Sequence, residues 1–157
     1  MSRAFTREQD DAPVDLAERP ISPHRNLVTP EGFSAIEAEI ESLQRELARE
    51  DEDDDEDKER VARLSRDLRY WRARRDSAEI LTPDPQSGVA RFGMSVTIES
   101  EDGETRTWKI VGEDEADVGH GTISHVSPVA KALFGKGVGE EIVINDRSWE
   151  IIALSAK

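Results

Sequence analysis

The sequence of 157 residues contains no cysteine, which excludes disulfide bonds and thiolate metal sites. Aromatic residues make up only 5% of the chain, and no apolar stretch approaches the length that a membrane-spanning helix needs. The N-terminus also lacks the basic and then apolar pattern of a signal peptide. These absences together predict a soluble protein of the reducing cytoplasm that makes no contact with a membrane.

Basic residues are also scarce, with 21 lysines and arginines against 35 acidic residues and a net charge of −14. Such a chain should not bind duplex DNA by itself, because neutralising the phosphates needs a basic surface. Any contact with nucleic acid should therefore pass through another protein. Acidity that serves only solubility is the alternative explanation of this charge.

Eight consecutive acidic residues, from Glu50 to Asp57, separate two stretches in which apolar residues recur every three or four positions. The apolar positions are Phe33, Ile36, Ile40, Leu43 and Leu47 before the run, and Val61, Leu64, Leu68 and Trp71 after it. Narrow apolar stripes of this kind are typical of two antiparallel helices that pack on each other. Eight like charges cannot lie between those helices. The sequence therefore predicts a helical hairpin with an acidic tip.

The ends of both helices follow from local signals. Thr29 can cap free backbone amides and Pro30 suits the first helical position, so the first helix is predicted to run from there to about Arg49. The second helix should begin near Lys58 and end near Ala78, ahead of two prolines. It is rich in arginine, and the first helix is rich in glutamate.

Beyond residue 88 the apolar period changes from about 3.6 residues to about 2, which indicates β-strands. Strands are expected around residues 94–98, 108–110, 142–144 and 149–153. Ser127 and Pro128 provide a cap and a first residue for one short helix between them. The fold class is therefore α+β, with a helical hairpin followed by a mostly antiparallel β domain that carries one short helix.

This interpretation divides the chain into four parts. They are a disordered or loosely docked acidic tail (1–26), the hairpin (27–81) with its acidic tip (50–57), a linker (82–88), and a compact C-terminal domain (89–157).

The order of motifs in the C-terminal half resembles that of the bacterial GreA/GreB transcript cleavage factors. The matching motifs are Phe92-Gly93, Asp102-Gly103, Ile110 to Asp117, Gly121 to Ser124, Ser127 to Leu133, and Gly135 to Glu140. In the N-terminal half, Leu27 to Gly32 resembles the entry to the family's first helix, and Arg69-Tyr70 resembles the second helix of GreB-like members. The resemblance extends from about residue 27 to the end of the chain.

The resemblance implies a coiled-coil hairpin joined to an FKBP-like domain. It implies that this domain binds RNA polymerase at the rim of the secondary channel. The hairpin would enter the channel and bring its tip acids to the active centre, where the polymerase cuts its own backtracked RNA by two-metal chemistry. The protein itself would then be a monomer and no enzyme. It would hold no cofactor of its own and would share only the polymerase's Mg²⁺.

The resemblance also suggests which residues act. Asp53, Asp54 and Asp55 would act in trans at the centre of the tip, with Asp53 and Asp54 as ligands of a Mg²⁺ ion shared within the polymerase. The predicted polymerase-binding residues are Ser124, Ser127, Pro128, Asp114 and Glu115, and the predicted contacts with RNA or the channel wall are Arg69 and Arg72.

Each prediction has a plainer alternative. The acidic run can be a solvated turn between helices, and the arginines can pair across the hairpin with the glutamates of the first helix. Ser124 to Pro128 can be merely a strand end and a capped helix, and Asp114 and Glu115 can belong to a solvated loop.

Two departures from the family leave the activity open. The run of acids replaces the family's own tip motif, and each helical arm is roughly two turns shorter, or ~10 Å less reach. A channel-blocking inhibitor, or an interaction protein like the regulator of nucleoside diphosphate kinase, is therefore an alternative to cleavage. A prolyl isomerase of the FKBP type would use Trp108, Phe134 and Trp149 as a pocket, although their spacing favours core positions.

Overall fold

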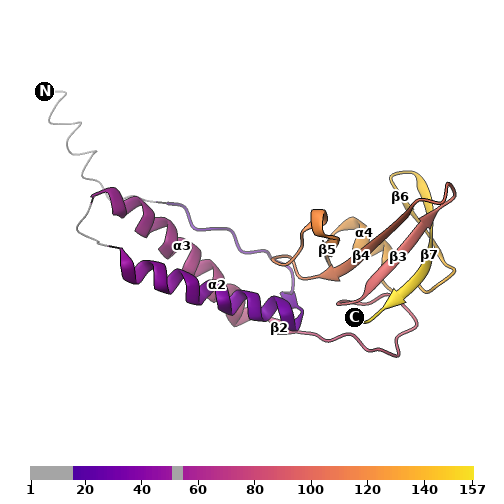
Figure 1. The fold of residues 1–157 in the computed structure, drawn as a ribbon, viewed down its shortest axis with the longest axis horizontal. Coiled ribbons are helices and arrows are strands. Elements are labelled where there is room, and N and C mark those ends of the chain that lie inside the picture. Colours follow the sequence, from indigo (N-terminus) through magenta and orange to yellow (C-terminus); the bar gives the residue numbers. More distant parts are fainter. Residues whose placement is uncertain (1–15, 51–54) are drawn as a thin grey trace, which may run out of the picture.

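The computed structural model describes residues 16–50 and 55–157 of the chain. The molecule is elongated, with a pair of helices at one end and a β domain at the other (Figure 1). Within the described residues, no helix combines the length and the apolar character that crossing a bilayer requires.

The hairpin consists of α2 (Pro30–Arg49) and α3 (Asp55–Ser77). Thr29 caps α2 by accepting a hydrogen bond from the Gly32 amide at 3.0 Å, as predicted. The interface between the helices buries the predicted apolar positions Ile36, Ile40, Leu43, Leu64 and Leu68. With 20 residues, α2 is a rod of about 30 Å.

The second helix begins at Asp55, three residues before the expected start near Lys58. Its first three residues are Asp55, Glu56 and Asp57. Negative charge is favourable in the first turn of a helix, because the helix dipole is positive there. Part of the acidic run is therefore compatible with helix, although like charges in sequence suggested a loop.

A short parallel pair of strands, β1 (Leu27–Val28) and β2 (Glu79–Ile80), closes the base of the hairpin. Successive side chains of a strand point to opposite sides. Accordingly, Val28 joins the apolar core of the hairpin, whereas Leu27 packs against the core of the β domain. Neither strand was predicted, since two residues are too few to show alternation.

The β domain is a five-stranded sheet in the order β5-β4-β3-β7-β6. Its strands are β3 (Ser95–Ser100), β4 (Thr105–Val111), β5 (Thr122–Ser124), β6 (Glu141–Ile144) and β7 (Arg147–Ser155). The four strands predicted from alternation are confirmed. The short β5 was missed, and it pairs in parallel with β4 while the other neighbours are antiparallel.

One face of this sheet carries the apolar core, and α4 (Pro128–Leu133) packs against it through Ala130 and Leu133. The short 3₁₀ helix η1 (Val118–His120) precedes β5. Trp149 lies in the core with 3% of its surface exposed, as its spacing suggested. The other face carries polar side chains together with the exposed Val143, and the hydroxyls of Thr97 and Thr107 lie 2.9 Å apart there.

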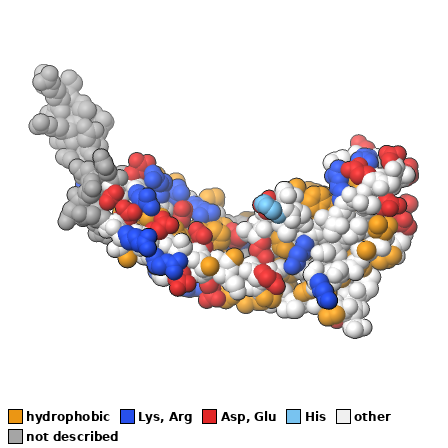
Figure 2. All heavy atoms as spheres, viewed as in Figure 1, with side chains coloured by type: hydrophobic (Ala, Val, Ile, Leu, Met, Phe, Trp, Pro, Cys, Tyr) orange, Lys and Arg blue, Asp and Glu red, His pale blue; other side chains and the backbone are white. Residues whose placement is uncertain are grey.

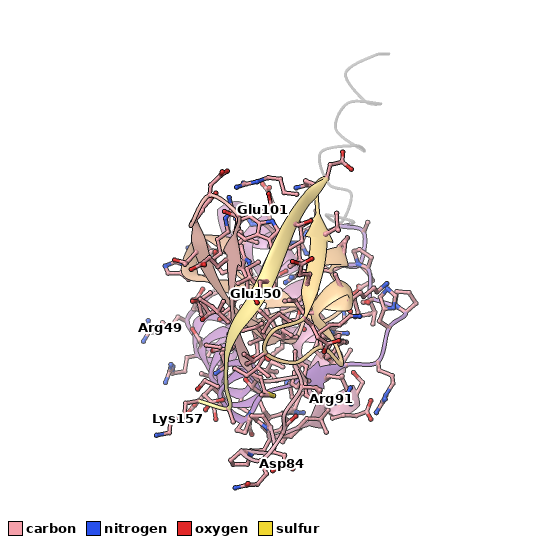
Figure 3. The ribbon with its side chains drawn as sticks, turned by 90° about the vertical axis from the view of Figure 1, so that its right-hand side faces the viewer. Arg49, Asp84, Arg91, Glu101, Glu150 and Lys157 are labelled. Atoms are coloured by element: carbon pink, nitrogen blue, oxygen red, sulfur yellow. The ribbon has the colours of Figure 1, made fainter. Side chains whose placement is uncertain are left out.

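Viewed from the end opposite the hairpin, Glu150 faces outward on β7 and Glu101 lies at the edge of the domain (Figure 3). Both side chains are exposed. This end of the molecule therefore offers acidic positions that take no part in contacts between the hairpin and the β domain.

Candidate functional site

The tip end of the hairpin is described up to Glu50 and again from Asp55. Glu50 does not extend freely: its Oε1 lies 2.8 Å from Nε of Arg60 on α3, and 13% of its side chain is exposed. Asp53 and Asp54 lie outside the described residues. The structure places Asp55 as the first residue of α3 and does not describe its side chain. The roles assigned to these three acids stay predictions.

The arginines of α3 have several kinds of partner, and basic and acidic side chains intermingle over the hairpin (Figure 2). Arg60 pairs across the hairpin with Glu46 at 3.5 Å, as well as with Glu50. Three others pair within α3: Arg63 with Glu59, Arg66 with Asp67, and Arg75 with Asp76. Pairing across the hairpin therefore explains only part of this basic helix.

The two predicted channel contacts differ in their surroundings. Arg69 forms an ion pair with Glu18 of the N-terminal segment, with 2.6 Å between Nη2 and Oε1. Arg72 is exposed, and no ion pair or hydrogen bond of its side chain occurs among the described residues. Of the two, Arg72 is the one whose charge is open to an incoming partner.

The residues 124–128, here termed the docking loop, contain three of the predicted polymerase contacts. Ser124 ends β5, and its hydroxyl accepts a hydrogen bond from the Val126 amide at 3.2 Å. Ser127 caps α4 by accepting from the Ala130 amide at 3.2 Å, and Pro128 is exposed as the first residue of that helix. The structure thus brings these three residues together in one ordered turn.

His125 anchors the docking loop to the β domain. Only 9% of its surface is exposed, and its ring packs edge-on against Phe92 with 5.6 Å between the ring centroids. Its backbone amide donates to the Val111 carbonyl at 2.9 Å. Burial lowers the pKa of His125, since removal from water disfavours the charged imidazolium. A neutral, packed ring therefore holds the loop in place.

Asp114, predicted as part of an exposed rim, instead contacts the hairpin. Its Oδ2 lies 2.6 Å from Nε of Arg74, and the two side chains are 10% and 2% exposed. The Tyr70 hydroxyl donates to its Oδ1. Arg74 also donates from Nη2 to Oδ1 of Asn26 at 2.8 Å, so its buried charge has hydrogen-bond partners on two sides.

Glu115 makes a second connection with the hairpin. Its Oε2 accepts from the backbone amides of Thr29 at 3.0 Å and Gly112 at 3.1 Å, and its Oε1 accepts from the Thr29 hydroxyl. A Cβ at Gly32 would overlap the Glu115 carboxyl group, and one at Gly112 would overlap the Leu27 carbonyl. The glycine in the first turn of α2, which costs helix stability, is therefore explained by a close approach.

We term Asn26, Thr29, Tyr70, Arg74, Asp114 and Glu115 the junction. Sequence reasoning missed Asn26, Thr29 and Arg74 as contacts with one another or with the β domain. The available signal was indirect: a glycine inside an expected helical turn, and another directly after a strand, mark places where something approaches the backbone closely.

The surroundings of Tyr70 in the junction lead to a prediction about its pKa. Burial, and to a lesser extent the hydrogen bond to Asp114, raise the pKa of Tyr70 to about 12. The phenol should therefore stay protonated as the pH rises past 10, where a solvated tyrosine ionises. Because the chain contains a single tyrosine, the ultraviolet absorbance of phenolate reports this group alone.

The same titration in denaturant is the control, and it should return the midpoint to about 10. An Asp114→Asn variant removes the negative charge beside the phenol, so its midpoint should lie between the two. A midpoint near 10 in the folded protein would show that Tyr70 is solvated in solution and not held in the junction.

The described residues contain no group of three or more histidine, aspartate or glutamate side chains placed to hold a metal ion. The docking loop and the junction are adjacent, because Val111 at the end of β4 pairs with Ser124 at the end of β5. The junction follows β4 and the docking loop follows β5. The two groups of residues therefore lie side by side where the β domain meets the hairpin.

Comparison with known proteins gives matches to the same family over both halves of the chain. Residues 85–156 match the model described as "Transcription elongation factor, GreA/GreB, C-term". The chain is 31% identical to transcription elongation factor GreA of Ruegeria pomeroyi, covering 81% of this chain and 95% of that protein. It is 33% identical to transcription elongation factor GreB of Yersinia pestis, covering 80% of this chain and 83% of that protein.

Solved structures give more distant matches. The crystal structure of GreA factor homolog 1 from Thermus thermophilus is 22% identical in sequence, with a TM-score of 0.40, covering 83% of this chain and 99% of that chain.

Proposed function

Because the chain belongs to the GreA/GreB family of transcription elongation factors, we propose that it binds RNA polymerase through its C-terminal domain and inserts its acid-tipped hairpin into the secondary channel. There it stimulates the cleavage of backtracked RNA. The chemistry belongs to the polymerase, since factors of this family are not enzymes themselves.

The observation that carries this proposal is a straight helical hairpin that points away from a separate β domain (Figure 1). The hairpin buries a narrow apolar interface and carries charged side chains outside. A hairpin with apolar side chains inside and charged side chains outside is compatible with entry into a polar channel. At about 30 Å, it is long enough to separate a docking site at one end from an active centre at the other.

The carboxylates of the tip are suited to a shared Mg²⁺ ion, because Mg²⁺ prefers oxygen ligands and is commonly held by one or two carboxylates together with substrate phosphates. Asp53 and Asp54 would supply such ligands, and Asp55 would lie beside them at the start of α3. The remaining ligands would come from the polymerase. A run of acids alone makes a poor cage for the ion, so the protein should bind Mg²⁺ only weakly by itself.

Docking is tested with a variant in which Ser124 and Pro128 are both replaced by alanine. Both residues lie in the docking loop, and neither belongs to an apolar core. We expect the dissociation constant for core RNA polymerase to rise at least about tenfold, equivalent to about 1.4 kcal/mol, because a few central residues dominate most interfaces. Fluorescence anisotropy of the labelled protein measures this.

The matched control replaces Ser148 and Pro85 by alanine. Both are exposed, on β7 and before β3 respectively, and the change has the same composition. Its dissociation constant should stay within about twofold of that of the unchanged protein. Equal binding by the docking-loop variant, or no binding by the unchanged protein, would refute the proposal.

A second candidate function is obstruction of the channel without cleavage. The observation that favours it is the length of the arms, since α2 and α3 have only 20 and 23 residues. A metal site tolerates errors of only about 0.2 Å in ligand distance, so a rod that ends too early would occupy the channel without reaching the ion. Binding with slower RNA synthesis and no cleavage would identify this function.

A further inference from the structure

Residues 16–26 form an extended segment that lies alongside α3 before it reaches β1 (Figure 1). The sequence suggested a disordered or loosely docked tail. Over its described length the segment contacts first α3 of the hairpin, then the β domain, and then the junction.

The first contacts lie on the outer face of α3. The guanidinium of Arg19 lies 3.8 Å from the centre of the Tyr70 ring, and its Nη1 lies 3.4 Å from Oδ1 of Asp67. A cation stacked on an aromatic face and paired with a carboxylate is held from two directions. Glu18 adds the ion pair with Arg69. This end of the segment is therefore fixed to the shaft of the hairpin.

The next contacts lie on the β domain and in the junction. The Ser22 hydroxyl donates to Oε1 of Glu113 at 2.8 Å. Glu113 lies two residues after the end of β4. Asn26 donates from Nδ2 to the Arg74 carbonyl at 2.7 Å and accepts from the Arg74 side chain. Tyr70, on which Arg19 is stacked, donates to Asp114 of the β domain. One chain of contacts thus runs from the shaft to the β domain and back to the base of the hairpin.

We propose that residues 16–26 are a brace that fixes the direction of the hairpin relative to the β domain. This inference rests on the proposed function, because direction matters only if the tip must arrive at a set place while the β domain is docked. Arg19 and Ser22 are then positioning residues, which act by holding Tyr70 and Glu113 in place.

Leverage explains why a brace is needed. A tilt of about 10° at the base displaces the end of a rod of ~30 Å by ~5 Å. Metal coordination requires ligands placed within a few tenths of an ångström. The junction reaches α3 at Tyr70 and Arg74, whereas the brace adds contacts at Asp67 and Arg69, up to about one helical turn further from the base. Contacts spaced along a rod resist tilting better than contacts at its base alone.

The direction of the hairpin can be measured as a distance between two spin labels. The chain has no cysteine, so Ala48→Cys near the end of α2 and Val143→Cys on β6 give two unique sites. Both side chains are exposed. Double electron–electron resonance is then recorded on the labelled full chain, on a chain that begins at Leu16, and on one that begins at Pro23. A full-length Arg19→Ala/Ser22→Ala variant avoids truncation altogether.

We expect one narrow distance distribution for the full chain and for the chain that begins at Leu16, which keeps every contact named above. The chain that begins at Pro23 and the double variant should show a distribution at least twice as wide. Circular dichroism should show the same helix content in all four, because neither apolar core includes a residue of the brace. An unchanged width in the double variant would overturn the proposal.

Titration against backtracked elongation complexes adds a functional readout. The half-saturating concentration of the double variant should stay within twofold of that of the unchanged chain. Its maximal effect on cleavage or synthesis should be at least fivefold smaller. A merely structural role would lower the folded fraction of the factor, which raises the apparent half-saturating concentration and leaves the maximal effect unchanged. If the full chain fails to bind polymerase, the proposed function fails, but the distances measured in the free protein still decide whether the brace exists.

Discussion

Replacing Arg74 by alanine is expected to lower the free energy of unfolding by about 3–5 kcal/mol, because it leaves a charge buried without its partner. The guanidinium is 2% exposed and the carboxylate of Asp114 is 10% exposed. The truncation also removes the hydrogen bond to Asn26. Urea denaturation followed by far-ultraviolet circular dichroism measures the change.

The control is Arg69→Ala, which removes an arginine from the same helix. Its ion pair with Glu18 is solvent-exposed, so the loss should be far smaller. Asp114→Ala should destabilise about as much as Arg74→Ala, and the double variant should cost much less than the sum, since both changes break one interaction. Additive effects would contradict a direct pair between Arg74 and Asp114 in the folded protein.

Much of the fold was predictable because local signals set it. The apolar positions between Phe33 and Leu47 repeat every three or four residues, and that spacing alone indicates a buried helical face. Thr29 and Ser127 mark helix starts, because each side chain accepts a hydrogen bond from the backbone amide three residues later. Alternation likewise revealed every strand of four residues or more.

The junction could not be predicted in the same way. Its hydrogen bonds join residues 40 to 86 positions apart, and no periodicity encodes such pairings. Arg74 looked like one of many arginines on a basic helix, yet it is the buried one. Asp114 and Glu115 looked like surface acids of a loop. Their partners lie on the hairpin, and only the packing of the two parts brings them together.

The docking loop represents an intermediate case. The sequence indicated the cap and the short helix, and the structure adds the buried His125 that anchors them. A histidine between Ser124 and Val126 gives no local sign of burial. Its ring packs on Phe92, which precedes β3 in the chain, whereas His125 comes after β4 and β5. The cap and the short helix could therefore be predicted from the sequence, whereas the buried histidine that anchors them could not.

Replacing Asp53, Asp54 and Asp55 together by alanine should reduce cleavage of backtracked RNA by about 100-fold or more, since even residues that only support metal ligands typically contribute 10–100-fold. Polymerase binding should persist, because the docking loop is unchanged. Cleavage is followed as the shortening of end-labelled RNA in stalled elongation complexes, at a factor concentration that saturates binding.

The matched control removes three acids from the other end of the molecule, as Glu101→Ala, Asp102→Ala and Glu150→Ala. All three side chains are exposed, and Glu150 faces away from the hairpin (Figure 3). Both triple variants change the net charge equally, so a general effect of acidity on association would weaken them alike. Loss confined to the tip variant requires carboxylates at the end of the rod. An equal loss of cleavage in both variants would mean that the tip acts only through its negative charge. Unchanged cleavage in the tip variant would mean that the tip carboxylates take no part in cleavage.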